Sequence, residues 1–217
     1  MKPTFPRLTS ANRRGFMLGA AASMMLVPLS SIPAAAQNSA AAQRIANHFS
    51  SVKTMAGEFV QFGPKGEQTG GKFFLSRPGK LRFNYEAPAS IYVISDGKSV
   101  AVRNEKLKTW EMYPLSSTPL KLLLSNQIDL SQQMVKDVKE DPDLITIVLG
   151  DKSVFGNSTI SMMFDPKTYE LKQWTIRDAQ GKDTSVMIYN VKTGVNFNSS
   201  AFTIPYDQAR PGGSFRN

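Results

Sequence analysis

The sequence predicts a mainly β protein, an antiparallel sheet of about ten strands that curls into a sandwich or a barrel and follows one helix. Strand signals recur at regular spacing between residues 55 and 191, with turn residues between them. Residues 72–96 hold three successive strand signals, and in the middle one Leu81, Phe83 and Tyr85 fall on the same face. A sheet with one apolar face must cover that face with helices, a second sheet or a ligand. Which of these covers it decides the function.

The first 36 residues fit an export signal rather than a part of the fold. Their start is basic and without an acidic residue, through Lys2, Arg7, Arg13 and Arg14. An apolar run over residues 16–29 is too short and too rich in small side chains for a membrane span, and three alanines before Gln37 fit a cleavage site. Residues 12–17, NRRGFM, also resemble a twin-arginine signal, so the general and the twin-arginine export routes both stay open.

Removal of this leader, residues 1–36, would leave residues 37–217 as a single domain in a bacterial periplasm. Four of the 26 Lys and Arg residues lie in the leader, which leaves 22 against 17 Asp and Glu and a net charge of +5. An exported protein meets little nucleic acid, so we expect none as a partner, and a mildly basic surface favours transient contact with anionic lipid headgroups. Since the chain has no cysteine, it has neither disulfides nor a site for a lipid anchor. We expect a soluble monomer.

Two segments fit helices. The first, residues 38–53, carries one apolar stripe at helical spacing, made by Ile45, Phe49 and Val52. The second, residues 117–124, has Thr118 as a possible cap and Pro119 at the first helical position, followed by four leucines. It is therefore apolar nearly all round.

The remaining segments fit strands and turns. A strand over residues 55–62 leads into a Gly-rich turn over residues 63–71, and Arg77-Pro78-Gly79 and Asp96-Gly97 provide turns within the next three strands. Further strands are expected at residues 99–103, 109–113, 134–139, 144–149, 159–164, 170–177 and 185–191. The tail from Arg210 is expected to lie outside the fold.

The inventory of reactive side chains argues against an enzyme. His48 is the single histidine and the chain has no cysteine, so zinc or copper sites and Cys–His pairs lack their members, and a serine triad would have to use His48. No nucleophile elbow, phosphate loop or dinucleotide motif occurs. Glu140, Asp141 and Asp143 cluster around Pro142, where a solvated turn explains them better than acid–base chemistry. We expect no catalytic residue, no cofactor and no metal site.

The apolar strand faces leave two interpretations open. Alternating aromatic side chains usually form ordinary core between packed layers. However, one N-terminal helix and residues 117–124 are little cover for so much apolar sheet. The leucine-rich segment also lies between strands, where a removable lid would fit. A ligand cavity is therefore the alternative to an ordinary core.

Five stretches, in order, resemble the LolA family of periplasmic lipoprotein carriers. They are residues 56–61 (AGEFVQ), 71–79 (GKFFLSRPG), 95–98 (SDGK), 118–124 (TPLKLLL) and 201–205 (AFTIP). Together they span the chain from about residue 40 to residue 206. The resemblance implies an incomplete antiparallel β-barrel, with helices covering its open side around an apolar cavity.

The resemblance also implies a function and a set of site residues. The protein would receive acylated lipoproteins from an inner-membrane lipoprotein-releasing transporter and ferry them to an outer-membrane acceptor, without cofactor or covalent chemistry. Arg77 corresponds to an arginine that hydrogen-bonds lid carbonyls and holds the empty cavity shut. The residues that correspond to the acyl-chain cavity and its lid are Phe59, Leu81, Phe83, Leu120, Leu123 and Leu124.

Two other readings use the same half-barrel. One is a carrier of free lipid, which the sequence does not separate from a carrier of acylated protein. The other is a sensor of misplaced lipoproteins or of a membrane-protein partner. A sensor would normally carry a second interaction domain, for which the 181 residues after the leader leave no room.

Overall fold

The computed structural model describes residues 34–131 and 134–209, with side chains from residue 40 onward. Eleven strands form one antiparallel sheet in the order β6-β5-β4-β3-β2-β1-β11-β10-β9-β8-β7. The strands are β1 (Thr54–Phe62), β2 (Gln68–Ser76), β3 (Lys80–Tyr85), β4 (Ile91–Asp96), β5 (Ser99–Asn104), β6 (Thr109–Pro114), β7 (Val135–Glu140), β8 (Ile145–Leu149), β9 (Thr159–Phe164), β10 (Leu171–Arg177) and β11 (Asp183–Thr193). The helices are α1 (Ala34–Ser51), α2 (Leu120–Leu123) and α3 (Lys152–Phe155), with 3₁₀ turns η1 (Leu115–Ser117) and η2 (Ser199–Phe202).

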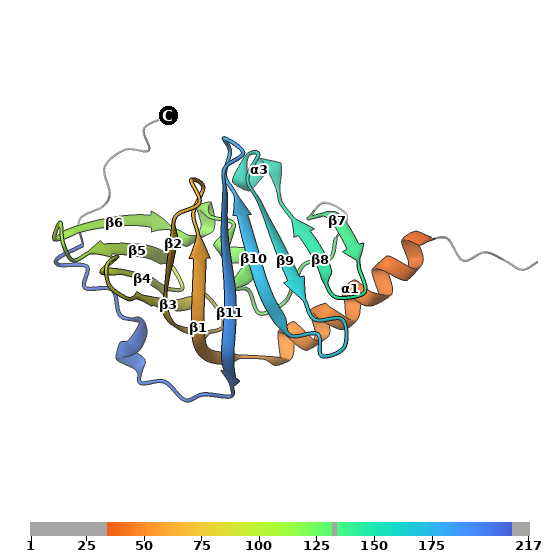
Figure 1. Ribbon diagram of the computed structural model, residues 1–217, viewed down its shortest axis with the longest axis horizontal. Helices are drawn as coiled ribbons and strands as arrows, with labels where there is room; N and C mark the ends of the chain where they lie inside the picture. The colour runs from red at the N-terminus through yellow and green to blue at the C-terminus, as the bar shows by residue number, and fades with distance from the viewer. Residues whose placement is uncertain (1–33, 132–133, 210–217) are drawn as a thin grey trace, which may run out of the picture. The chain divides into compact units, whose positions relative to one another are not determined.

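The sheet is strongly curved and stays open. Figure 1 shows β3 to β6 running across the direction of β1 and β11, so that the sheet curls around one apolar face. Its two outermost strands, β6 and β7, do not pair with each other within the described residues. The expected mainly β fold and the incomplete antiparallel barrel are both confirmed.

Alternation along the strands decides which side chains face the inside. In the ladder between β2 and β3, Leu75 lies opposite Leu81 and Phe73 opposite Phe83. All four are buried, whereas Arg82 between them faces the outer side, where its Nη1 donates to the carbonyl of Ala201. A one-residue shift of register would reverse these faces, so the apolar pattern fixes the register.

Helix α1 covers the inner face on the side of β7 to β9. Ile45 and Phe49 are buried on its apolar stripe, and the ring of Phe49 meets that of Phe164 on β9 edge-to-face, with centroids 6.3 Å apart. The helix was expected over residues 38–53, and the structure shows that it begins four residues earlier and ends two residues earlier. Residues 1–33 of the expected leader lie outside the described residues. The leader and the domain boundary at residue 37 stay predictions.

The Gly-rich segment was wrongly predicted in part. The turn over residues 63–71 is shorter than expected, because β2 begins at Gln68 and pairs with β1 through Gly70 and Gly71. Glycine keeps both backbone hydrogen-bonding groups, so it remains in a ladder wherever its partner strand continues. The short helix α3 was also missed, although Asp151 caps it by accepting from the amide of Ser153.

The chain after β11 covers part of the outer face. Ile204 and Ala209 are buried against Ile94 of β4 and Ala101 of β5. Figure 1 shows this segment in blue, passing from the end of β11 along the outside of β3 to β5. The tail expected from Arg210 lies outside the described residues.

Candidate functional site: the apolar interior and the segment that covers it

The six predicted cavity residues lie in one apolar cluster on the inner face of the sheet. They come from β1, β3 and the segment of α2, and they are Phe59, Leu81, Phe83, Leu120, Leu123 and Leu124. Five of the six are buried, and Leu120 is partly buried and packed against the others. The structure therefore brings the predicted set together, and its role in binding an acyl chain stays a prediction.

Aromatic rings fill the centre of this cluster. The ring of Phe59 meets those of Phe83 and Tyr85 edge-to-face, at centroid distances of 4.6 and 4.9 Å. Trp174 on β10 reaches the ring of Phe83 at 6.1 Å. Sequence reasoning left Phe73 and Trp174 out of the site, although strand alternation from Phe83 across the ladder marks Phe73 as inward-facing.

Tyr85 is the polar member of the aromatic cluster. Its hydroxyl donates to Oε1 of Gln61 on β1 at 2.6 Å, which satisfies the partly buried phenol. Burial raises the pKa of Tyr85 to about 12, while the hydrogen bond to Gln61 acts in the opposite direction. The interior thus tolerates a neutral phenol and disfavours its charged form.

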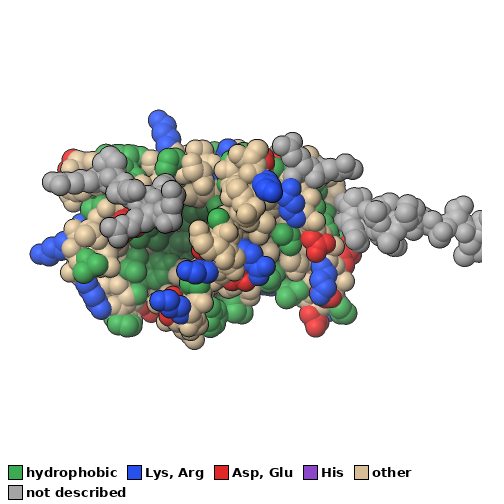
Figure 2. Space-filling model, turned by 90° about the horizontal axis from the view of Figure 1, so that it is seen from above, with side chains coloured by type: hydrophobic (Ala, Val, Ile, Leu, Met, Phe, Trp, Pro, Cys, Tyr) green, Lys and Arg blue, Asp and Glu red, His purple; other side chains and the backbone are tan. Residues whose placement is uncertain are grey.

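The centre of the apolar interior is closed in this conformation. Phe59, Leu81 and Leu123 are 0% exposed, so no space that admits water touches them. Figure 2 looks onto the end of the sheet where the β1–β2 and β10–β11 hairpins lie, and it shows a hollow with hydrophobic side chains inside. The apolar interior thus meets the surface at this end, while its centre is packed.

The segment that covers the interior consists of η1 and α2. The expected helix over residues 117–124 is shorter, because α2 has only four residues and Thr118 does not cap it. Instead, the hydroxyl of Thr118 donates to the carbonyl of Leu115. Two backbone bonds to the sheet hold this segment: the amide of Leu115 donates to Lys98 O at 2.9 Å, and the amide of Gly79 donates to Leu124 O at 2.8 Å.

Arg77 lies at the junction between the sheet and α1. Its Nη1 donates to the carbonyl of Val52 at 2.6 Å, its amide donates to Lys53 O at 2.8 Å, and its guanidinium lies 3.8 Å from the centre of the Phe49 ring. The expected bond to carbonyls of residues 118–124 is replaced, in the described residues, by this bond to the end of α1. Burial lowers the pKa of Arg77 to about 10, so the group stays charged at neutral pH.

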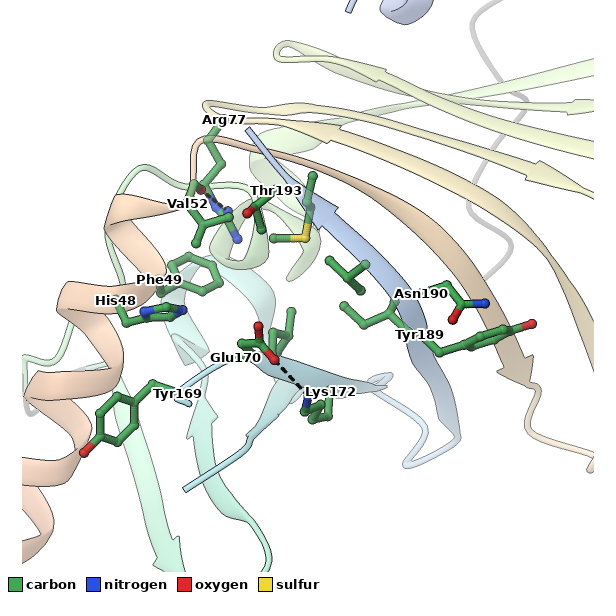
Figure 3. Close-up of a pocket in the computed structure, with 14 residues that line it drawn as sticks. His48, Phe49, Val52, Arg77, Tyr169, Glu170, Lys172, Tyr189, Asn190 and Thr193 are labelled. Atoms are coloured by element: carbon green, nitrogen blue, oxygen red, sulfur yellow. Dashed lines mark hydrogen bonds and ion pairs between the residues drawn. The ribbon is translucent and has the colours of Figure 1, made fainter. Parts of the chain in front are cut away.

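A pocket opens beside Arg77. It has a volume of about 220 Å³ and lies between the end of α1 and strands β10 and β11. Figure 3 shows the guanidinium of Arg77 directed toward this pocket, with Phe49 and His48 of α1 on one side and Tyr189 and Asn190 of β11 on the other. Ligand pockets typically measure about 300–1,000 Å³, so this space is small for a long acyl chain.

The carboxylates around Pro142 lie on the surface, as expected. Glu140, Asp141 and Asp143 are exposed, and Asp141 accepts from the ammonium of Lys139 at 2.7 Å. Within the described residues no three acidic or histidine side chains gather as ligands for a metal ion. No helix in the described part of the chain combines the length and the hydrophobicity of a membrane span.

Known proteins resemble this chain over the same segments. The family described as outer membrane lipoprotein carrier protein LolA matches residues 50–205. An outer-membrane lipoprotein carrier protein of Chromobacterium violaceum is 30% identical over 196 residues, covering 86% of each chain. The protein of the same name from Pseudomonas aeruginosa PAO1 is 26% identical over 182 residues, covering 77% of this chain and 85% of its own. Among solved structures, a LolA superfamily protein from Nitrosomonas europaea has a TM-score of 0.44 and 9% identity, covering 76% of this chain and 98% of that one.

The matched region begins within α1, contains β1 to β11, and ends after η2. It includes the covering segment and every residue of the predicted cavity. The resemblance found in the five sequence stretches is confirmed, and the chain belongs to the LolA family.

Proposed function

We propose that this protein is a periplasmic carrier that shelters the acyl chains of lipoproteins in its apolar interior and takes them from the inner to the outer membrane. Support comes from the family match over residues 50–205 and from relatives that are named as lipoprotein carriers. The single structural observation that carries the proposal is the apolar face of the sheet beneath a short, weakly tethered α2.

An apolar interior suits the transport of acyl chains through water. Each acyl CH₂ moved out of water is worth about 0.8 kcal/mol, so a lipoprotein does not cross an aqueous space unaided. A carrier must bind such chains and also release them, which favours non-directional apolar contacts over polar anchors. The interior around Phe59, Leu81 and Leu123 offers such contacts.

Loading requires the covering segment to move, because the interior is packed in this conformation. Closed packing lowers the apparent affinity for cargo by the free energy needed to open it. Gly79 opposes this movement through its bond to Leu124 O, and Arg77, two residues earlier in the same turn, is bonded to Val52 O just after α1. The turn after β2 thus connects both helices to the sheet, and we assign Arg77 the role of a latch on this basis.

The inner-membrane releasing transporter and the outer-membrane acceptor belong to this proposal as partners. It requires neither catalysis nor a cofactor, and it includes transient contact with the membrane surface at loading and release.

Mass spectrometry of the protein purified natively from periplasm tests the proposal. Triacylated polypeptide bound to the protein is expected. A matched control replaces a captured lipoprotein's acylated cysteine by alanine, which should abolish its recovery. Free lipid in place of acylated polypeptide would show a lipid carrier instead, and equal recovery of the unacylated form would contradict binding through acyl chains.

A further inference from the structure

Arg77 is a buried cation with unused hydrogen-bonding capacity. The residue is 6% exposed, and Nη1 is its one side-chain nitrogen with a hydrogen-bond partner among the described residues. Nε and Nη2 are buried without a partner in the same part of the chain. A buried donor left unpaired costs about 1–3 kcal/mol, and more when it is charged. Such a group is a candidate for binding a ligand.

The two unused nitrogens form one edge of the guanidinium. Nε–H and one Nη2–H point in the same direction, and this edge binds the two oxygens of a carboxylate or phosphate side by side. The same chain provides an example at Arg177, whose Nε and Nη2 lie 2.8 Å from Oδ1 and Oδ2 of Asp183. At Arg77 no described residue provides such a partner for this edge.

Charges around the pocket do not compensate Arg77. Glu170 is the one carboxylate among the described residues that line the pocket, and its Oε2 already accepts from the ammonium of Lys172 at 3.0 Å. The hydroxyl of Tyr169 accepts from Nε of Arg44. Phe49 lies over the face of the Arg77 guanidinium, 3.8 Å from its centre, and offers no hydrogen-bond acceptor to Nε or Nη2. His48 and Tyr189 also line the pocket, and neither is a carboxylate.

Part of the pocket wall is apolar. Six side chains supply this surface: Phe49, Val52, Met55, Leu171, Ile188 and Val191. We propose that this pocket binds the carboxylate or phosphate end of an anionic amphiphile, with both oxygens on Nε and Nη2 of Arg77 and the first carbons of the tail against these walls. The volume of about 220 Å³ suits a headgroup with a short length of chain. This site goes beyond the carrier function and does not depend on it.

Calorimetric titration of the purified protein with three probes of equal tail length tests the site. Octanoate and octyl phosphate carry the anionic oxygens, and 1-octanol has the same tail without charge. We expect at least one anion to bind 10-fold or more tightly than octanol. The stronger anion identifies the source as a fatty acid or as a phosphate-bearing lipid. Equal binding of all three probes would overturn the proposal.

Variants locate the binding. Arg77→Lys keeps the positive charge but lacks the paired donors, so the advantage of the anion over octanol should fall at least 10-fold. Val191→Trp narrows the pocket at a residue that is 39% exposed, and Val154→Trp is its control on α3, 49% exposed and away from the pocket. The first tryptophan should weaken octanoate binding and the second should not. Equal binding by both would overturn the location.

A measurement on the unaltered protein covers the case in which Arg77→Lys does not fold. The ¹⁵Nε–¹H resonance of Arg77 should shift on addition of octanoate and stay in place on addition of octanol. A resonance that octanoate leaves unchanged would overturn the proposal. These titrations contain no lipoprotein, so their failure is distinct from failure of the carrier function.

Discussion

The amide of Gly79 donates to the carbonyl of Leu124 at 2.8 Å, and through this bond the turn after β2 holds the end of α2. Two residues earlier in the same turn, Arg77 holds the carbonyl of Val52 at the end of α1. Three consecutive residues thus connect both covering helices to the sheet. A change in this turn is therefore expected to act on both helices together.

Replacing Gly79 by alanine should disturb this turn more than the same change at Gly66. Both glycines have left-handed backbone, with φ of +78° and +81°, so both substitutions bring a strain of about 1–2 kcal/mol. At Gly79 the new Cβ would also lie 2.6 Å from Cα of Gly97, whereas at Gly66 nothing lies within 4 Å. We expect Gly79→Ala to lower the free energy of unfolding by at least 1 kcal/mol more than Gly66→Ala in urea titrations. Equal losses would show that the contact between the new Cβ at residue 79 and Gly97 costs no additional free energy.

Arg77→Leu should slow the release of cargo. Loss of a charge-assisted hydrogen bond removes about 1.5–3 kcal/mol from the closed form, which corresponds to about 10- to 100-fold in the ratio of closed to open protein. Loaded protein should then pass its lipoprotein to acceptor membranes about 10-fold more slowly. Arg82→Leu is the matched control, because Arg82 lies on the outer side of the adjacent strand. Unloading of Arg77→Leu at the unaltered rate would count against the latch.

The sequence predicts the sheet well because its evidence is local. Leu81, Phe83 and Tyr85 alternate with polar residues, which by itself indicates a strand with one buried face. Turn residues mark where the strands end. Every expected strand has its counterpart, with the largest error at the start of β2, where glycine suggests a turn but the partner strand continues. The helix over residues 117–124 was too long, because Thr118 bonds to Leu115 instead of capping α2.

The membership of the apolar cluster was predictable from the sequence, whereas its packing and its contacts were not. Periodicity and resemblance identify the buried set around Phe59 and Leu123, yet neither shows whether the interior is open or packed. The partner of Arg77 depends on where α1 ends relative to the turn after β2, a contact between residues 25 positions apart. The pocket beside Arg77 combines α1, β10 and β11, and no local pattern brings these segments together.

Tyr85 should make the protein less stable as the pH rises from about 10 to about 12. Its pKa is raised to about 12 in the fold and is about 10 in the unfolded chain, so the unfolded state loses its proton first over this interval. The free energy of unfolding should fall by about 2 kcal/mol more in the unaltered protein than in Tyr85→Phe. Urea titrations of both proteins at pH 9, 10.5 and 12 measure the difference. Arg77, whose pKa is lowered in the fold, should raise the free energy of unfolding over the same interval. Both proteins keep Arg77, so its effect cancels when they are compared. A parallel decline in the two proteins would contradict the assignment.

The covering segment should open without unfolding of the sheet. The amide of Leu124 donates to Leu120 O at 3.1 Å within a four-residue helix, whereas Phe59 lies in β1 between two paired strands. Few backbone bonds join the segment to the sheet, so its opening free energy should lie at least 2 kcal/mol below that of β1. Native-state hydrogen exchange at the amide of Leu124 and at β1 amides paired with β2 or β11 gives both values.

Leu123→Ala removes a fully buried side chain from the covering segment and should lower the opening free energy measured at Leu124 further. Its matched control, Leu107→Ala, alters a leucine that is 70% exposed and should change neither. Equal opening free energies at Leu124 and in β1 would mean that the interior opens by global unfolding alone, and a lid that moves on its own would then be ruled out as the route for cargo.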